Sequence, residues 1–445
     1  MITFCRRRRV PRVRLYASLQ FGTKSHVSGV QFLYVPPEAT PHSDHKRTAS
    51  ENQGNRLLQH MGWDVASAYS HPASLETKVN EALRMFVSHE VNLPEEIPVY
   101  ESKRAHYRMR SWFSVTCLSR GGLKFWKGLH ELPASAFSHG LLEALGVFWE
   151  HVLSDNRLQW NMRYLHVHTT SIGDAALMLS YRGSWHRSWE DAALRFNKDT
   201  GIPIAGLRFS PSRAGHWAGT ASGERLWVDD GMAQALGKRA CRVLHDRDWV
   251  VEHFASASRI LTYQQVIALF SQPNHGICQR MLQWAEFETR GSSGDLLELY
   301  CGNASFTLAL AHNFRRCLAT ELSRDLVMLA QVNIARNSIR NVEVLQAGSS
   351  EVAEAIQKSQ VVLCDDCTSV NLSDFEFCTI LVDPTRRGLD KGTKQLLKRF
   401  TTILYISCNV VTLVQDLRYL LRTHDLKSVA FFDQVPDTHK NLESG

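Results

Sequence analysis

The chain has 445 residues, of which 44% are hydrophobic and 21% charged, a balance typical of soluble globular proteins with about two domains. No apolar run approaches the roughly 20 residues that span a bilayer, which excludes a membrane helix, and ten scattered cysteines are not the dense pattern of a secreted disulfide scaffold. The net charge of +7 comes from the leader, because residues 1–37 carry seven Lys/Arg and no acid. Overall charge is therefore weak evidence for nucleic-acid binding.

The leader begins MITFCRRRRVPRVRLYASLQF, an Arg-rich and acid-free composition that is typical of mitochondrial transit peptides. A disordered basic tail or a nuclear signal has the same composition, so a cytoplasmic or nuclear location is the alternative. Residues 36–75 read as a polar linker. We predict that residues 1–75 form a disordered leader and linker.

Residues 76–270 predict an α+β domain. The apolar spacing of LETKVNEALRMFVSHEV predicts a helix, strand-like stretches flank Gly121-Gly122, and YLHVHTTSIGDAALMLSY predicts a hairpin that turns at residues 172–174. Residues 102–130 carry seven Lys/Arg, no acid and interleaved aromatics. Such a pattern suits RNA, whose phosphates and splayed bases contact cations and rings; a pair of strands with buried aromatics is the alternative.

Residues 271–445 predict an α/β domain with a mostly parallel sheet and helices on both faces. Short apolar runs such as DLLELY, CLATEL, FCTILVDP and TTILYISCN alternate with helical patterns. Ligands of such sheets bind beyond the carboxyl ends of the strands. Four polar or reactive side chains occupy those ends: Tyr300, Glu321, Asp383 and Cys408.

A glycine loop and an acid indicate a nucleoside cofactor. Gly302 follows the first strand, and Glu321 ends the second strand, where a carboxylate can accept the hydroxyls of a ribose. The chain has no GxGxxG and no GxxxxGK[ST], so no cradle for a pyrophosphate is evident. S-adenosylmethionine, a nucleoside without phosphates, fits better than a dinucleotide.

Several motifs together resemble one family, the S-adenosylmethionine-dependent RNA uracil-5-methyltransferases, and most closely the branch that makes 5-methyluridine in the T-loop of tRNA. The resemblance runs from about residue 100 to the end. It is carried by HYRMR (106–110), FSQPN (270–274), GDLLELYCGNASFTLALAHNF (294–314), ATEL (319–322), VDPTRRGLD (382–390), LYISCN (404–409), FDQVPDTH (432–439) and LES (442–444). It implies a Rossmann-like class I methyltransferase domain behind an N-terminal RNA-recognition domain.

The resemblance also implies roles for individual residues. Cys408 matches the nucleophile that adds to C6 of uracil, and Glu443 matches the base that removes the C5 proton. The cofactor-binding positions are Gln272, Tyr300, Gly302, Ser305, Glu321 and Asp383, and the RNA-binding positions are Tyr107, Arg108 and Arg110. The reaction needs a thiolate nucleophile because C5 of uracil becomes nucleophilic only after addition at C6.

The chain departs from the family pattern at several positions. Thr385 and Val410 stand where the family has prolines, and Ala304-Ser305 replaces Gly-Asn in the glycine loop. The family continues past the LES motif with a short apolar segment, which would be the last strand of the sheet. We predict that the chain is truncated at that strand, with an impaired copy as the alternative; without the strand the sheet would have a gap.

Three functions remain open at this stage. The first is a tRNA uracil-5-methyltransferase, the second a non-catalytic RNA-binding or tRNA-folding paralogue, and the third an rRNA uracil-5-methyltransferase. The scattered Cys117, Cys241 and Cys278 lack the clustering of an iron–sulfur site, which favours the tRNA branch. A lone Cys364-x-x-Cys367 is a poor zinc site, so no metal is predicted, and no protein partner is predicted.

Overall fold

The computed structural model describes most of the chain. The described residues are 1–6, 26–27, 30–37, 75–117, 123–126, 134–181, 186–209, 215–219, 225–229, 241–243, 247–257, 259–358, 360, 362–364 and 369–436. The predicted Gly121-Gly122 turn, most of the linker and Glu443 lie outside these ranges.

A seven-stranded sheet forms the centre of the C-terminal part, in the order β17-β16-β15-β20-β21-β1-β22. Its first five strands run parallel, as predicted. They are β15 (Asp295–Leu299), β16 (Cys317–Glu321), β17 (Val342–Gln346), β20 (Phe377–Val382) and β21 (Thr402–Tyr405). Both faces of this sheet are buried, which is why these strands read as continuous apolar runs.

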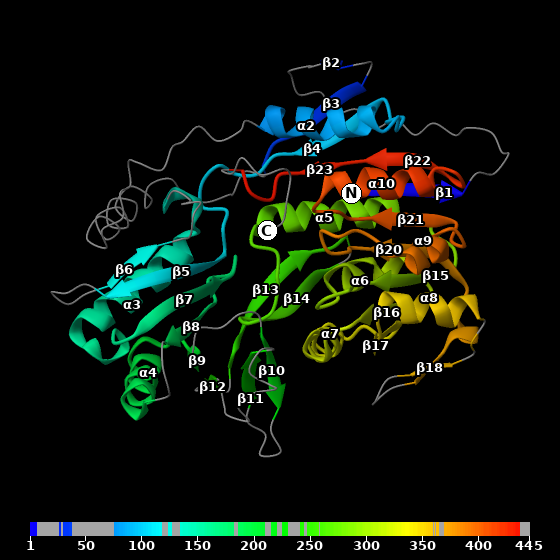
Figure 1. Cartoon of the computed structure of the whole chain (residues 1–445). Coiled ribbons are helices and arrows are strands. Elements are labelled where there is room, and N and C mark those ends of the chain that lie inside the picture. Colours follow the sequence, from blue (N-terminus) through cyan, green and yellow to red (C-terminus); the bar gives the residue numbers. More distant parts are fainter. Residues whose placement is uncertain are drawn as a thin grey trace.

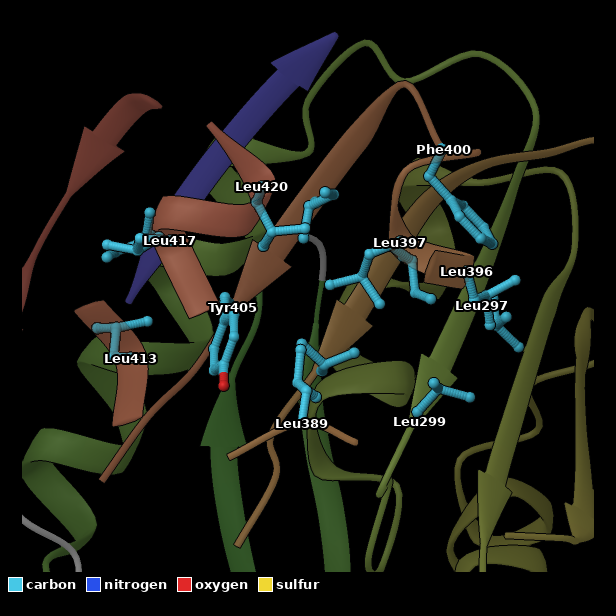
Figure 2. Close-up of a cluster of buried hydrophobic side chains, with 14 of the residues drawn as sticks. Leu297, Leu299, Leu389, Leu396, Leu397, Phe400, Tyr405, Leu413, Leu417 and Leu420 are labelled. Atoms are coloured by element: carbon cyan, nitrogen blue, oxygen red, sulfur yellow. The ribbon is translucent and has the colours of Figure 1, made fainter. Parts of the chain in front are cut away.

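Alternate side chains of each strand enter two separate cores. Leu297, Ile380 and Ile403 belong to one core, while their neighbours Leu296 and Leu381 belong to the other. The first core is covered by α2 (Leu75–Ser88), α8 (Ser349–Gln357), α9 (Lys391–Leu397) and α10 (Val410–Leu420). Figure 2 shows leucines of this core around Tyr405. The second core is covered by α5 (His275–Glu288), α6 (Ser305–Leu310) and α7 (Arg324–Arg336).

The N-terminal residues differ from the sequence prediction. Ile2–Arg6, assigned above to a disordered leader, forms β1, which pairs antiparallel with β21 on one side and with β22 (His424–Val429) on the other. Ile2 is 1% exposed in the first core. The strand supplies hydrogen-bonding partners to two strands that would otherwise present unpaired backbone groups. In the described sheet, β1 therefore occupies the position between β21 and β22.

A small four-stranded sheet joins early residues to the C-terminal part. Its order is β2 (His26–Val27), β3 (Val30–Val35), β4 (Glu96–Tyr100) and β23 (Phe431–Phe432). Tyr100 stacks on Phe432 at 4.6 Å between ring centroids, and the buried Lys78 of α2 donates to Asp433 Oδ1 at 3.0 Å. Residues 75–100, predicted to begin the N-terminal domain, thus pack against the C-terminal part (Figure 1).

The N-terminal domain is built on a six-stranded sheet. Its order is β12 (Cys241–Val243), β9 (Ile204–Phe209), β8 (Ala175–Tyr181), β7 (Met162–Thr169), β5 (Arg110–Cys117) and β6 (Leu123–Trp126). Helices α3 (His139–Ser154) and α4 (Arg187–Thr200) pack on one face around a core that contains Phe113, Leu165 and Phe148. The β7–β8 hairpin confirms the turn predicted at residues 172–174.

Three two-stranded hairpins complete the fold. They are β10 (Gly215–Gly219) with β11 (Arg225–Asp229), β13 (Trp249–Ala255) with β14 (Ile260–Val266), and β18 (Val362–Cys364) with β19 (Ser369–Asn371). Phe254 and Tyr263 of the β13–β14 hairpin share a core with α5, α6 and α7, so this hairpin packs with the C-terminal part. Among the described helices, none has the length and apolar character that crossing a membrane requires.

Candidate active site

The predicted strand-end residues lie along one edge of the seven-stranded sheet. Tyr300 follows β15, Glu321 ends β16, Asp383 follows β20, and Cys408 comes three residues after β21. Because β16, β15, β20 and β21 are consecutive parallel neighbours, their carboxyl ends meet at the same edge. The structure therefore divides the edge into a cofactor half at β16 and β15 and a thiol half at β20 and β21.

The thiol half surrounds a small cavity of about 50 Å³. Cys408, half-buried and not in a disulfide, lines the cavity together with Asp383, Gln272 and Gln434. Met1 lines it as well, because β1 brings the chain's first residue to this edge. The cavity thus joins residues from four distant segments around one thiol.

Asn409 and Ser407 fix the loop that carries Cys408. Asn409 Nδ2 donates to Arg386 O at 2.9 Å, and its Oδ1 caps α10 by accepting from Val411 N. Ser407 Oγ donates to Asn409 O at 3.0 Å. These contacts tie the loop after β21 to the loop after β20, although both loops lack the prolines expected from the family pattern.

Asp416 of α10 also joins β21 to the loop that follows β20. Its Oδ2 accepts from Tyr405 Oη at 2.8 Å and from Leu389 N at 3.0 Å, and Lys394 Nζ lies 2.7 Å from Oδ1. Gly388 passes so close that an added Cβ would stand 3.0 Å from Asp416 Oδ2. Asp416 is 2% exposed, so this buried network holds the end of β21 to the loop that follows β20.

Asp383 has an unusual electrostatic setting. Burial raises the pKa of its carboxyl to about 7, while the Met1 ammonium group acts in the opposite direction. Burial also lowers the pKa of the Met1 amino group to about 5, and that group donates to Ala430 O at 2.8 Å. A carboxyl that titrates near neutral pH beside a thiol is suited to proton handling.

Two amide oxygens in this cavity have no hydrogen-bond partner among the described residues. They are the buried Gln272 Oε1 and Gln434 Oε1, and Gln434 Nε2 donates to Met281 Sδ at 3.0 Å. A buried polar atom without a partner costs about 1–3 kcal/mol, so these oxygens are placed to receive a ligand. Gln272 was expected from the sequence. Gln434 was not, although it lies within the quoted FDQVPDTH motif.

The cofactor half is built around Gly302. Its backbone N–H donates to Glu321 Oε2 at 3.1 Å, its φ is +56°, and an added Cβ would meet no atom within 4 Å. The open space beside a glycine and a carboxylate fits the ribose of S-adenosylmethionine. Tyr300 Oη donates to Ser349 Oγ at 2.7 Å.

The altered positions of the glycine loop are both accounted for by protein contacts. Ser305 Oγ donates to Asn303 Oδ1 at 2.5 Å, and Ser305 O accepts from Tyr263 Oη at 3.0 Å. Ala304 adopts φ +63°, a left-handed conformation that favours glycine. The loop therefore keeps its turn at the cost of some backbone strain.

Glu298 is a second residue that the sequence reasoning missed. It lies within β15, is 1% exposed and accepts a hydrogen bond from Thr307 Oγ1. Burial raises its pKa to about 8, so it carries a proton at neutral pH. An acid in the middle of an apolar strand was the available signal.

The predicted RNA-binding residues have mostly internal contacts. Arg110 donates to Leu269 O and Ser271 Oγ, both at 2.8 Å, and Arg108 Nε donates to Arg110 O at 3.1 Å. Tyr107 is 3% exposed within the N-terminal core. In this structure Arg110 joins β5 to the segment before α5.

Comparisons with known proteins identify the family of the chain. The family described as tRNA (Uracil-5-)-methyltransferase matches residues 232–445. The tRNA/tmRNA (uracil-C(5))-methyltransferase of Azoarcus sp. is 33% identical over 386 residues, covering 84% of this chain and 96% of its own. This chain belongs to the tRNA (uracil-5-)-methyltransferase family. The Pectobacterium carotovorum relative of the same description is 34% identical, over 80% of this chain and 90% of its own.

A solved structure supports the fold. The Pyrococcus abyssi tRNA (uracil-54, C5)-methyltransferase, determined in complex with S-adenosyl-L-homocysteine, superposes with a TM-score of 0.55 and 18% identity. The match covers 82% of this chain and 79% of that chain. It confirms the class I methyltransferase architecture predicted for the C-terminal part.

Proposed function

We propose that this protein methylates C5 of a uridine in the T-loop of tRNA, using S-adenosylmethionine and a covalent bond between Cys408 and C6 of the base. The observation that carries the proposal is the shared cavity of Cys408, Asp383 and the unpartnered Gln272 oxygen at the carboxyl edge of the sheet. Membership of the family supports the activity, and the relatives' names support tRNA as the substrate.

Residues in the two halves of the site have different roles in the proposed reaction. Gly302, Glu321 and Tyr300 would hold the nucleoside part of S-adenosylmethionine, which supplies an electrophilic methyl group when bound. The Cys408 thiolate forms a bond to C6, and the electron pair of the C5–C6 bond moves to make C5 nucleophilic. After C5 has accepted the methyl group, a base takes the C5 proton and the thiolate leaves from C6. Glu443 is the predicted base.

Asp383 is suited to bind the polar edge of the base or the cofactor. With a pKa near 7, its carboxyl can accept or donate a hydrogen bond at neutral pH. Asn409 and Asp416 act as positioning residues, because they hold the two loops without lining the cavity.

A methyl-transfer assay tests the proposal. The protein, tRNA transcript and methyl-labelled S-adenosylmethionine should yield labelled 5-methyluridine, and Cys408→Ala should yield none. Cys378→Ala is the matched control, because Cys378 is another half-buried free thiol that lies in β20, away from the cavity. Product on rRNA but not tRNA transcripts would favour the rRNA enzyme, and no product with intact RNA binding would favour the non-catalytic paralogue.

The Arg-rich leader supports a mitochondrial location, with cytoplasm or nucleus as alternatives. Because Ile2–Arg6 is a strand of the catalytic sheet, cleavage of the leader would remove that strand. We therefore expect an uncleaved leader. Mass spectrometry of the N-terminal peptide from fractionated cells checks both the location and the cleavage.

A further inference from the structure

A second and much larger cleft lies where the N-terminal domain meets the start of α5. Its volume is about 1010 Å³. Residues from five segments line it, within the ranges 35–37, 101–109, 138–143, 170–173 and 274–280. Nothing in the mechanism above uses this cleft.

The cleft adjoins the catalytic cavity through a few hydrogen bonds. Asn274 lines the cleft, and its Nδ2 donates to Ser102 Oγ at 2.8 Å and to Gln434 O at 3.3 Å. Gln434 and Gln272, two residues before Asn274, line the cavity that holds Cys408. A polymer that delivers one unit to Cys408 would therefore place its neighbouring units at or near the cleft.

Cations lie at two sides of the cleft. Lys103 and Arg104 are exposed on one side, and Arg280 of α5 is half-buried on the other. Two acids also line the cleft: Glu101, which lies 3.8 Å from Arg104 Nη2, and Glu143. The cations outnumber the acids, as a phosphate-bearing ligand requires.

A stacked pair of imidazoles forms part of the wall. The rings of His106 and His139 lie 3.8 Å apart at 25°. His106 Nδ1 is 2.9 Å from Phe137 O, and His106 has a φ of +57°, a strained conformation for a residue with a side chain. The ring is thus held at a fixed angle beside an open space, which is how proteins present a stacking surface to an unpaired base.

We propose that this cleft binds the nucleotides of the RNA that flank the target uridine. Lys103, Arg104 and Arg280 contact their phosphates, and an unstacked base lies against the His106–His139 pair. The inference rests on the proposed function for the identity of the RNA, but it assigns the RNA contacts to residues other than Arg108 and Arg110.

Binding measurements test the cleft directly. Lys103→Glu/Arg104→Glu should raise the Kd for a tRNA T-arm hairpin by at least about 10-fold and make the Kd less dependent on salt. His139→Ala should raise it by about 10-fold through loss of stacking. The matched control is Arg187→Glu/Lys198→Glu on α4, two exposed cations of the same domain outside the cleft, which should leave the Kd within about twofold.

Cofactor affinity and the covalent step separate this inference from the proposed function. Both cleft variants should bind S-adenosylmethionine as the unaltered protein does and should still couple Cys408 to saturating 5-fluorouridine RNA. If both cleft variants bind the hairpin within twofold of the unaltered protein, the cleft is not an RNA site, whatever the activity. If the cleft variants bind the hairpin more weakly, as expected, but neither they nor the unaltered protein methylate RNA, the RNA site in the cleft is supported and the proposed function is wrong.

Discussion

The amides at the edge of the seven-stranded sheet and Arg110 in the six-stranded sheet differ in their hydrogen-bond partners. In the seven-stranded sheet, polar side chains stand at the carboxyl ends of strands, and two of the amide oxygens there, those of Gln272 and Gln434, have no protein partner. In the six-stranded sheet, Arg110 lies within the fold and donates its hydrogen bonds to the protein itself. The two amide oxygens are therefore available to a ligand, whereas Arg110 holds two parts of the chain together.

Two buried histidines, His166 and His168, lie near Arg110. His166 and His168 are at most 1% exposed, and burial together with the nearby Arg110 charge keeps the pKa of each well below its usual value. His168 Nε2 lies 3.0 Å from Gln265 Oε1. The Arg110 guanidinium is thus satisfied by acceptors within the protein, so a basic motif in the sequence is not by itself an RNA contact.

Arg110→Met should break these hydrogen bonds and produce the largest effect. The change leaves the Leu269 carbonyl and the Ser271 hydroxyl without their buried cation, which should lower the free energy of unfolding by about 3 kcal/mol. Urea denaturation measures the change. Arg84→Met, at an exposed site on α2, should stay within about 0.5 kcal/mol. If Arg110→Met keeps its stability but loses RNA binding, Arg110 is an RNA contact and not a structural residue.

Ile2→Ala tests whether β1 belongs to the catalytic sheet. Removing a side chain that is 1% exposed should lower the free energy of unfolding by about 2–3 kcal/mol. The exposed Val87→Ala is the control. An Ile2 that lay in a detached leader would show no change in the urea midpoint.

Glu298→Gln should change how stability depends on pH. The folded-state pKa of Glu298, about 8, lies above its usual value near 4, so the folded state holds a proton that the unfolded state releases, and stability falls as pH rises across that window. The amide has no proton to lose. The variant should therefore match the unaltered protein near pH 4 and exceed it in stability by a margin that grows as the pH rises to 8. Equal slopes of stability against pH would contradict the buried, protonated acid.

Gln434→Met separates a ligand-binding amide from a structural one. Because the Gln434 oxygen has no protein partner, the variant should be as stable as the unaltered protein. Its kcat/KM for tRNA should fall about 10-fold, equivalent to about 1.4 kcal/mol of transition-state binding. A loss of stability without a change in kcat/KM would make Gln434 a packing residue.

Ala304→Gly should have the smallest effect. Glycine adopts the φ of +63° without the steric strain of a Cβ, so the variant should be more stable by about 1 kcal/mol, less the added backbone freedom of the unfolded chain. Thermal unfolding with and without S-adenosylmethionine measures this gain. A lower melting temperature would show that the Ala304 methyl contributes more by packing than it costs in strain.

The catalytic half was predictable because its signals are local. Apolar runs that end in Tyr300, Glu321, Asp383 and Cys408 indicate parallel strands with functional ends, and the structure brings those ends to one edge. The motifs then supplied the family. These signals need only a strand and the residues that follow it.

The remaining features depend on partners far away in the chain. The sequence did not predict β1 because arginines dominate the composition of the leader and because the strands that pair with β1 lie some 400 residues later. Arg110 finds its carbonyl acceptor 159 residues away, and the unpartnered state of Gln434 exists only in the folded cavity. Each is a tertiary contact, which a pattern of neighbouring residues does not encode.

The central claim is a transient covalent bond at Cys408, and peptide mapping of the trapped adduct tests it most directly. Protein incubated with 5-fluorouridine-containing tRNA and S-adenosylmethionine is digested with nuclease and trypsin. The account predicts the added nucleotide mass on the tryptic peptide of residues 400–418, whose one cysteine is Cys408. An adduct on another cysteine, or methylated tRNA formed with no adduct on this peptide, would contradict it.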